Sequence, residues 1–137
     1  VYEGEFQNGE HHGNGKLTLG TKLNDTDGVY EGEWKNSWKL EGKMTYVNGN
    51  VYNGEWRDGK VNGQGKMTYA NGNVYNGEWK DDLPHGQGKK TYVNGNVYEG
   101  EWKNDQINRS RTVLVWVSAL VYNCTVRISV KVYLFIY

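Results

Sequence analysis

The sequence contains too little cysteine for a disulfide-based fold. Its one cysteine, Cys124, has no second cysteine in the chain with which to form an internal bridge. Without disulfides the default environment is a reducing one, so we expect a cytoplasmic protein. No signal peptide is recognisable, but the chain begins at Val1 instead of methionine, and we expect it to be a fragment of a longer protein.

Apolar residues are also scarce, at 36% of 137 residues, which is too few for a thick single core. Aromatic residues are nevertheless abundant, with 6 Trp and 11 Tyr, and 19 Gly stand against a single Pro. Disordered chains are poor in aromatic residues, so this composition argues against disorder. It favours an extended fold of short strands, in which flat rings cover a thin layer and glycine serves turns and close approaches.

An excess of charge of one sign is missing from the whole chain, whose net charge is zero. The charges are unevenly placed, because residues 1–106 hold all 16 acidic residues and have a net charge of −4, whereas residues 107–137 have a net charge of +4. A mildly acidic surface does not attract the phosphates of DNA or RNA, so we expect no nucleic-acid partner. The same charge weakens purely electrostatic docking to anionic lipid.

Internal repetition is the strongest pattern in the sequence. The copy that begins at Val51 reads VYNGEWRDGKVNGQGKMTYANGN, and the copy that begins at Val74 reads VYNGEWKDDLPHGQGKKTYVNGN, both of 23 residues. The copy that begins at Val29 is one residue shorter, with the loss in the turn after Trp34, and the first copy carries Phe6 in place of this tryptophan. We therefore predict a repeat domain over residues 1–106, with hairpins at about residues 1–20, 29–50, 51–73 and 74–96 and a partial hairpin at residues 97–106.

Each copy has the pattern of a β-hairpin. Strand alternation places Tyr52, Gly54 and Trp56 on one face, and the Asp-Gly pair at 58–59 and the Asn-Gly pair at 71–72 supply the positive φ of tight turns. Recurring glycine and β-branched residues disfavour helix. The predicted fold is all-β, an elongated single-layer antiparallel sheet of tandem hairpins, in which rings lie over glycine backbone and hairpins stabilise one another by stacking.

The repeated pattern Y-x-G-E-W-x-x-G-x-x-x-G-x-G resembles the MORN repeat (membrane occupation and recognition nexus). The resemblance covers about residues 1–105. In the fourth copy Asp82 replaces one glycine, and in the second copy Leu40 and Glu41 stand near the first glycine expected of the final pair. The third copy fills every position of the pattern, with Tyr52, Gly54, Glu55, Trp56, Gly59, Gly63 and Gly65.

The resemblance implies a non-catalytic module for protein–protein contact or scaffolding, with cytoskeletal and ciliary scaffolds among its relatives. It implies a protein partner, and open sheet edges add a physical reason to expect a homodimer. Two alternatives remain open, namely peripheral binding of phospholipid, such as phosphoinositide, and service as the regulatory repeat region of a larger enzyme, such as a lipid kinase or SET-domain methyltransferase. The implied location is cytoplasmic, at the cytoskeleton, the cilium or the membrane periphery.

No set of residues predicts catalysis, a cofactor or a metal site. Five glutamates recur at one register position, and we expect them on the outer strand face, paired with a row of lysines. Because repetition makes these carboxylates equivalent, they do not offer the unequal environments of a catalytic pair. The histidines fall in turns, far in sequence from the one cysteine, which disfavours zinc. The glutamates are Glu5, Glu33, Glu55, Glu78 and Glu101, the lysines are Lys16, Lys43, Lys66 and Lys89, and the histidines are His11, His12 and His85.

A row of aromatic residues is the predicted interaction face. A single-layer sheet does not hide both faces, so we expect part of this row to remain accessible to a partner, although the rings also hold the stack together. Trp38 lies outside the register of the row and is either a local plug or an exposed contact. The row consists of Tyr30, Trp34, Tyr52, Trp56, Tyr75, Trp79, Tyr98 and Trp102.

Residues 107–137 differ from the repeats, because glycine disappears and valine dominates. The uncharged run at residues 112–126 is too short for a confident membrane span, and residues 126–132 alternate as a strand does. Three interpretations of this apolar, basic tail remain open: capping strands, a membrane-associating segment, or a non-native continuation of the chain.

An exposed run this apolar and β-prone favours aggregation. We predict that a chain ending near Asn104 is more soluble than the full chain, as measured by the soluble fraction after expression and by light scattering. Equal solubility with and without the tail would contradict this prediction.

Overall fold

The structure, a computed structural model, describes the backbone of residues 1–20, 27–108, 113–121 and 124–132, and the side chains of the first two of these ranges. In this part of the chain every regular element is a strand, and the strands form one 12-stranded sheet. The strands are β1 (Tyr2–Gln7), β2 (Glu10–Leu19), β3 (Gly28–Lys35), β4 (Trp38–Tyr46), β5 (Val51–Arg57), β6 (Lys60–Thr68), β7 (Val74–Lys80), β8 (Leu83–Thr91), β9 (Val97–Lys103), β10 (Gln106–Ile107), β11 (Val113–Val121) and β12 (Cys124–Val132).

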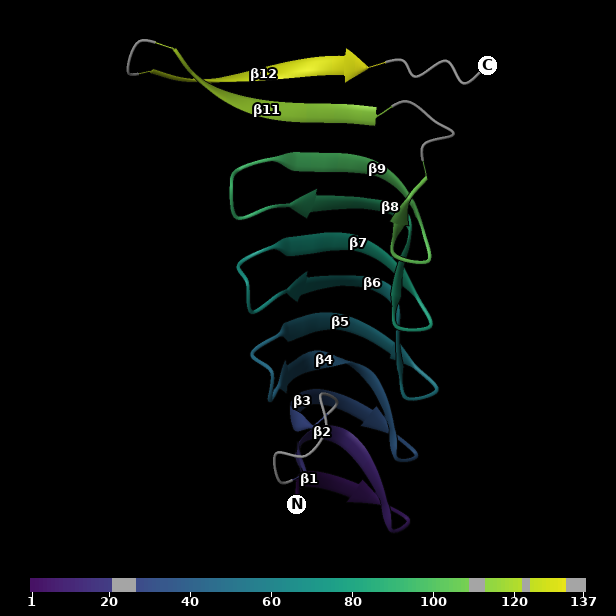
Figure 1. Cartoon of the computed structure of the whole chain (residues 1–137). Coiled ribbons are helices and arrows are strands. Elements are labelled where there is room, and N and C mark those ends of the chain that lie inside the picture. Colours follow the sequence, from purple (N-terminus) through teal and green to yellow (C-terminus); the bar gives the residue numbers. More distant parts are fainter. Residues whose placement is uncertain (21–26, 109–112, 122–123, 133–137) are drawn as a thin grey trace.

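The sheet follows the order of the sequence. Each strand from β1 to β9 pairs antiparallel with the next, β11 and β12 continue the sheet beyond β9, and β10 also pairs with β9. Figure 1 shows the resulting ribbon, one layer thick, with the first and last strands at opposite ends. The predicted all-β, single-layer antiparallel sheet of tandem hairpins is confirmed.

A bulge bends each of the four complete hairpins. In β5 and β6, Gly54 pairs with Gly65 and Trp56 pairs with Val61, so two steps along β5 span four steps along β6. The additional backbone passes through Gly63, whose φ of 80° is one that other residues rarely adopt. The strands therefore curve strongly, as Figure 1 shows. In each complete hairpin the tyrosine ring lies edge-on to the tryptophan ring, or to Phe6 in the first hairpin. We call the surface that carries these rings the ring face, on which the aromatic row from Tyr30 to Trp102 lies.

The two kinds of turn differ in how they are stabilised. At the hairpin tip Asp58 and Gly59 have φ values of 51° and 77°, as predicted. In the turn between hairpins only Gly72 has a positive φ, of 89°, so the prediction for Asn71 is wrong. Asn71 instead accepts a hydrogen bond through Oδ1 from the backbone N–H of Asn73, at 3.0 Å, which is the local side-chain bond that makes asparagine suitable for turns.

Tyrosine rings lie directly over paired glycines, as predicted. A Cβ atom added to Gly65 would collide with the ring of Tyr52, and one added to Gly54 would collide with the backbone of β6. The Tyr52 hydroxyl reaches past the glycine pair and donates a hydrogen bond to the Glu55 carbonyl, at 3.0 Å. Tyr52 is fully buried, so the glycines create the slot that the ring fills.

The last strands continue the register of the repeats. On β9 the position of the repeated tryptophan, Trp102, pairs with Ile107 of β10, and the position of the repeated tyrosine, Tyr98, pairs with Val115 of β11. In a complete hairpin the tryptophan likewise pairs near the start of the second strand and the tyrosine pairs further along it, as Trp56 does with Val61 and Tyr52 with Met67. Thus β10 and β11 together occupy the place of a second strand beside the partial repeat at residues 97–106. The three interpretations of the tail, with capping strands among them, stay predictions.

The glycine slot gives a direct test of the stacking interaction. We predict that Gly65→Ala lowers the free energy of unfolding by at least about 2 kcal/mol, because a methyl group at this position overpacks the Tyr52 ring. Urea denaturation of the full chain measures the change. Gly59→Asp is the matched control, since Asp82 occupies the same loop position in the next hairpin with a φ of 68°. Equal stability of the two variants would show that the slot is not tight.

Candidate functional site: an irregular joint on the ring face

The predicted interaction row is buried along its whole length. Tyr30, Tyr52 and Tyr75 have no exposed surface, and the least buried member, Trp56, is 8% exposed. The expectation that part of the row stays accessible is therefore wrong for the single chain. The physical reason is the curvature of the hairpins, which lets rings of successive hairpins cover one another instead of lying on an open plane.

Tryptophan joins each hairpin to the one before it. The Trp79 ring lies edge-on to Tyr75 of its own hairpin, at 5.0 Å between centroids, and edge-on to Tyr52 of the preceding hairpin, at 5.5 Å. Its indole N–H donates to the carbonyl of Gly65 on that hairpin, at 3.0 Å. Trp34 and Trp102 donate in the same way to Gly15 and Gly88. These contacts make the row the structural core of the stack.

The repeated glutamates have a structural role that the sequence analysis missed. Glu55 accepts a hydrogen bond from the backbone N–H of Gln64, at 3.0 Å, and its carboxylate lies beside Gly63, so it holds the bulge of its own hairpin. Glu5 and Glu78 hold the equivalent backbone of Asn14 and Gln87. The expected pairing of this glutamate row with lysines is therefore wrong for these three residues. The ion pairs with lysines of that row involve other glutamates, in the pairs Lys16–Glu31 and Lys89–Glu99.

The histidines are dispersed among the hairpins. His11 stacks on the Tyr2 ring at 3.7 Å between centroids, and His12 and His85 occupy the same position of two different repeats. Within residues 1–20 and 27–108, no three side chains of the metal-binding types gather as a metal site requires.

The joint between β4 and β5 departs from the others. Two steps along β3, from Gly32 to Trp34, span only three steps along β4, from Gly42 to Lys39, because this hairpin lacks one residue. The glycine bulge is shortened in consequence. The next tryptophan, Trp56, also differs from its equivalents, because its buried indole N–H has no hydrogen-bond partner.

A second connection is also altered at this joint. Between the next two hairpins, Asp82 donates its N–H to the Val61 carbonyl at 3.0 Å and accepts from the Val61 N–H at 2.8 Å. Gly59 stands at the loop position of Asp82 and has no side-chain oxygen to accept from Lys39. The joint between β4 and β5 therefore lacks this side-chain acceptor as well as the tryptophan hydrogen bond.

Lys39 occupies a repeat position that is apolar in the next two hairpins, as Val61 and Pro84, and is His11 in the first. It pairs with Trp34 as Val61 pairs with Trp56, yet Val61 is only 2% exposed. The Lys39 ammonium lies 4.9 Å from the centre of the Tyr30 ring and 4.6 Å from that of Trp56. Burial lowers the pKa of Lys39 below that of a solvated lysine. Among the described side chains, no carboxylate lies within 4.0 Å of its Nζ.

A cavity of about 530 Å³ opens at this joint. Its walls are mostly apolar, and burial is the main reason that the pKa of Tyr46 is raised to about 12. Asp82, at its edge, already accepts the N–H of Val61. Its charged side chains are Lys39, Asp27 and Asp82, and its main apolar and aromatic side chains are Met44, Tyr46, Trp56, Val61 and Met67.

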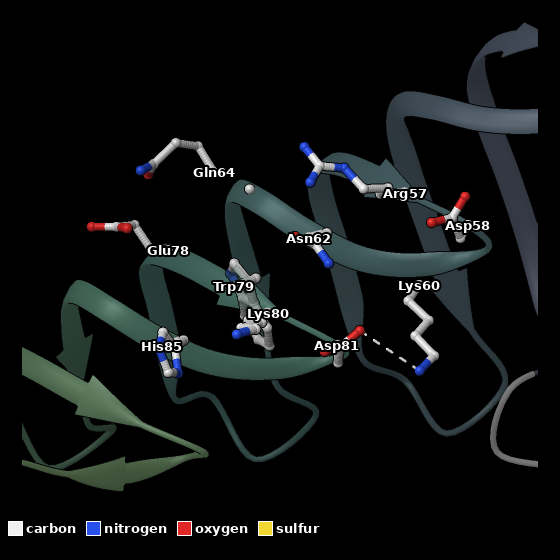
Figure 2. Close-up of a pocket in the computed structure, with 11 residues that line it drawn as sticks. Arg57, Asp58, Lys60, Asn62, Gln64, Glu78, Trp79, Lys80, Asp81 and His85 are labelled. Carbon is white, nitrogen blue, oxygen red and sulfur yellow. Dashed lines mark ion pairs between the residues drawn. The ribbon is translucent and has the colours of Figure 1, made fainter.

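A second cavity, of about 660 Å³, lies near the hairpin tips and is lined mainly by polar side chains (Figure 2). Lys60 pairs there with Asp81, at 3.7 Å between Nζ and Oδ1. Glu78 is engaged in holding the backbone of its bulge. Charges of both signs are balanced, with Arg57, Lys60 and Lys80 against Asp58, Glu78 and Asp81. This balance gives no preference for a polyanion.

The sequence contained a signal for the joint. The missing residue of the second copy and the lysine in an apolar position are both visible in the aligned repeats. The sequence does not show, however, that the Trp56 indole N–H lacks an acceptor, because Gly42 stands where Gly65 and Gly88 accept from the tryptophan of the following hairpin.

Tandem antiparallel hairpins, joined in one open sheet by buried tyrosine and tryptophan, define a solenoid-like repeat protein of the all-β class. The family model of the MORN repeat matches residues 2–21, 30–39, 41–51, 52–74, 75–97 and 98–109. The chain therefore belongs to the MORN repeat family, and its matches separate at residue 40, within the shortened hairpin. A search of curated proteins found no match.

The tryptophan hydrogen bonds can be tested by a matched pair of substitutions. Trp79→Phe removes a bond to Gly65, whereas Trp56→Phe removes a buried N–H that has no acceptor. We predict that Trp79→Phe is the more destabilising of the two by about 1 kcal/mol, measured by urea denaturation of the full chain. Equal losses would mean that ring packing alone determines the contribution of these residues.

Proposed function

We propose that this chain is a non-catalytic protein-binding module whose partner docks on the ring face at the joint between β4 and β5. The observation that supports this proposal most strongly is the cavity of about 530 Å³, whose lining combines apolar and aromatic side chains with one lysine and two aspartates. Methionine side chains adapt to the shape of a partner, and pockets with mainly apolar walls and few polar groups are typical of binding sites.

The surface next to the cavity favours a partner with apolar side chains. Tyr46, Tyr69 and Tyr92 are partly buried against the core, at equivalent positions of three successive repeats. They form a line along the ring face that an extended peptide can follow. Trp38 and Leu40, on the strand that borders the cavity, are 54% and 40% exposed. We propose this surface in place of the buried aromatic row.

The proposal excludes catalysis by the repeats themselves. Three of the five repeated glutamates, Glu5, Glu55 and Glu78, are engaged with backbone N–H groups, and the equivalent positions of the row do not provide an acid and a base with different environments. A regulatory role beside an enzymatic domain elsewhere in a longer chain agrees with the same binding surface. We place the module in the cytoplasm, as a scaffold at the cytoskeleton or cilium.

Phospholipid binding is the second hypothesis, and its physical support is weaker. The net charge of residues 1–106 is −4, and the charges around the cavity at the hairpin tips are balanced. In the described part of the chain, no helix has the length and apolar character needed to cross a bilayer.

Face-selective photo-crosslinking tests the proposed function. A photoreactive amino acid is placed in the full chain at Tyr69, on the ring face, or at the adjacent Thr68, on the opposite face. In extract of the source cells, we predict at least about fivefold more protein adduct from position 69, since hot spots of binding are concentrated in small areas. An excess of unlabelled chain should compete for the adduct.

A liposome sedimentation assay, with and without phosphoinositide, accompanies the crosslinking. Equal adducts from both faces would contradict the protein-binding proposal. Strong, salt-sensitive sedimentation without any face-selective protein adduct would favour the lipid hypothesis instead.

A further inference from the structure

We infer that Asn8, at the tip of the first hairpin, converts spontaneously to isoaspartate through a succinimide formed with the backbone nitrogen of Gly9. This modification site goes beyond the proposed function and does not depend on it. Asn-Gly pairs are the natural place for this reaction, because glycine has no side chain to hinder attack by its nitrogen on the preceding asparagine. The described residues contain eight such pairs, which begin at Asn8, Asn14, Asn48, Asn53, Asn62, Asn71, Asn76 and Asn94.

The reaction needs only water as a second reactant. The Gly9 nitrogen forms a bond to Cγ of Asn8, the bond between Cγ and Nδ2 breaks, and Nδ2 leaves as ammonia with the proton of the attacking nitrogen. Water then opens the cyclic imide. Cleavage at the side-chain carbonyl gives aspartate, whereas cleavage at the backbone carbonyl gives isoaspartate, in which the chain continues through Cγ. The first step depends on an accessible glycine nitrogen and on an asparagine side chain that can turn toward it.

Four of the eight pairs are restrained by the sheet. They lie in β2, β5, β6 and β7, and each of these strands has a partner strand on both sides. Turning the glycine nitrogen toward the asparagine side chain would require opening of the paired strands. We therefore expect slow conversion at these four, which are Asn14, Asn53, Asn62 and Asn76.

The three pairs in the turns between hairpins are restrained by hydrogen bonds. Gly72 donates its N–H to the Tyr69 carbonyl at 2.9 Å, and Asn71 accepts through Oδ1 from the Asn73 N–H at 3.0 Å. The first bond engages the nitrogen that would attack, and the second fixes the direction of the side-chain amide. The same two bonds occur in the turns at residues 48–50 and 94–96.

Asn8 and Gly9 have neither kind of restraint. Both are exposed, in the turn between β1 and β2, and a Cβ atom added to Gly9 would meet nothing within 4 Å. Within the described part of the chain, no acceptor takes the N–H of Gly9 and no donor holds the side-chain amide of Asn8. The attacking nitrogen and the amide are thus both accessible to water and to each other.

Other hairpin tips are tied to the hairpin before them. Their second residue donates its backbone N–H to a carbonyl of that hairpin at 3.0 Å, in the pairs Ser37–His11, Asp82–Val61 and Asp105–Pro84. Gly9 has no earlier hairpin beside it in the described sheet, because β1 is the first strand. Reaction requires Asn8 to rotate out of its turn conformation, and this local opening costs less here than at the other Asn-Gly pairs.

The experiment follows the full chain at neutral pH by mass spectrometry of tryptic peptides, with electron-transfer fragmentation to separate isoaspartate from aspartate. Residues 1–16 form one tryptic peptide, in which fragmentation also distinguishes Asn8 from Asn14. We expect isoaspartate to form at Asn8 at least about tenfold faster than at Asn71, the internal control, because two hydrogen bonds must break in the control turn. In urea, where the turns are absent, the two rates should become similar.

The chain itself supplies a matched variant. Asn36 and Ser37 occupy the same two tip positions in the second hairpin, with φ values of 49° and 64°, so Gly9→Ser preserves the turn. The serine side chain hinders attack by its own nitrogen. We expect conversion at Asn8 to slow at least about fivefold in this variant, with the urea midpoint unchanged.

Equal rates at Asn8 and Asn71 in the native chain, or a tenfold difference that persists in urea, would overturn the inference. So would an undiminished rate in Gly9→Ser. Aspartate as the sole product would also contradict it, because direct hydrolysis of the side-chain amide gives aspartate alone and only the succinimide leads to isoaspartate. None of these outcomes affects face-selective crosslinking, so this inference and the proposed function succeed or fail separately.

Discussion

The close approach of tyrosine rings to glycine backbone is the constraint on which the rest of this structure depends. A two-stranded hairpin is marginally stable alone, and this chain has few aliphatic residues with which to bury a conventional core. The paired glycines, such as Gly54 and Gly65, leave a slot that the Tyr52 ring fills completely. The bulge beside them curves the hairpin, and the curvature brings the following tryptophan onto the previous unit. Burial is thereby obtained from a single layer, without a second sheet.

Because each joint repeats the same contacts, a change in one copy is visible as a local defect. The shortened second hairpin loses part of its bulge, the Trp56 N–H has no hydrogen-bond partner, and Lys39 stands at a position that is apolar in the next two hairpins. A repeat protein tolerates such a departure because neighbouring hairpins supply their own interfaces. Departures from a protein's own local rules often mark functional sites, which is the reason for proposing a binding surface at this joint.

The aromatic row is buried in the single chain, so its rings are not available to contact a partner. Rings that are the most regular feature of the sequence serve the stack, and the accessible surface consists of less regular residues, such as Tyr46 and Trp38. If the proposed function holds, specificity would depend on the positions that vary between copies. In this chain the ring-face lysines, Lys39 and Lys90, are two such positions.

The sequence by itself determined the all-β class, the hairpin units and the pairing of tyrosine with glycine, because these follow from alternation, turn residues and a strict 23-residue period. It also placed Asp58 and Gly59 correctly in a turn with positive φ. These features depend on residues close together in the chain, so local stereochemistry suffices to predict them.

Only the tertiary structure decided which rings are accessible, what the repeated glutamates bind, and where a cavity opens. The predicted row became buried because curvature sets each tryptophan against a tyrosine of the preceding hairpin, as Trp79 lies against Tyr52. The unpaired N–H of Trp56 was hidden for the same reason, since the equivalent tryptophans find their acceptors in the preceding hairpin. Contacts between hairpins depend on the amount of bend in each one, and that bend is a property of the assembled sheet.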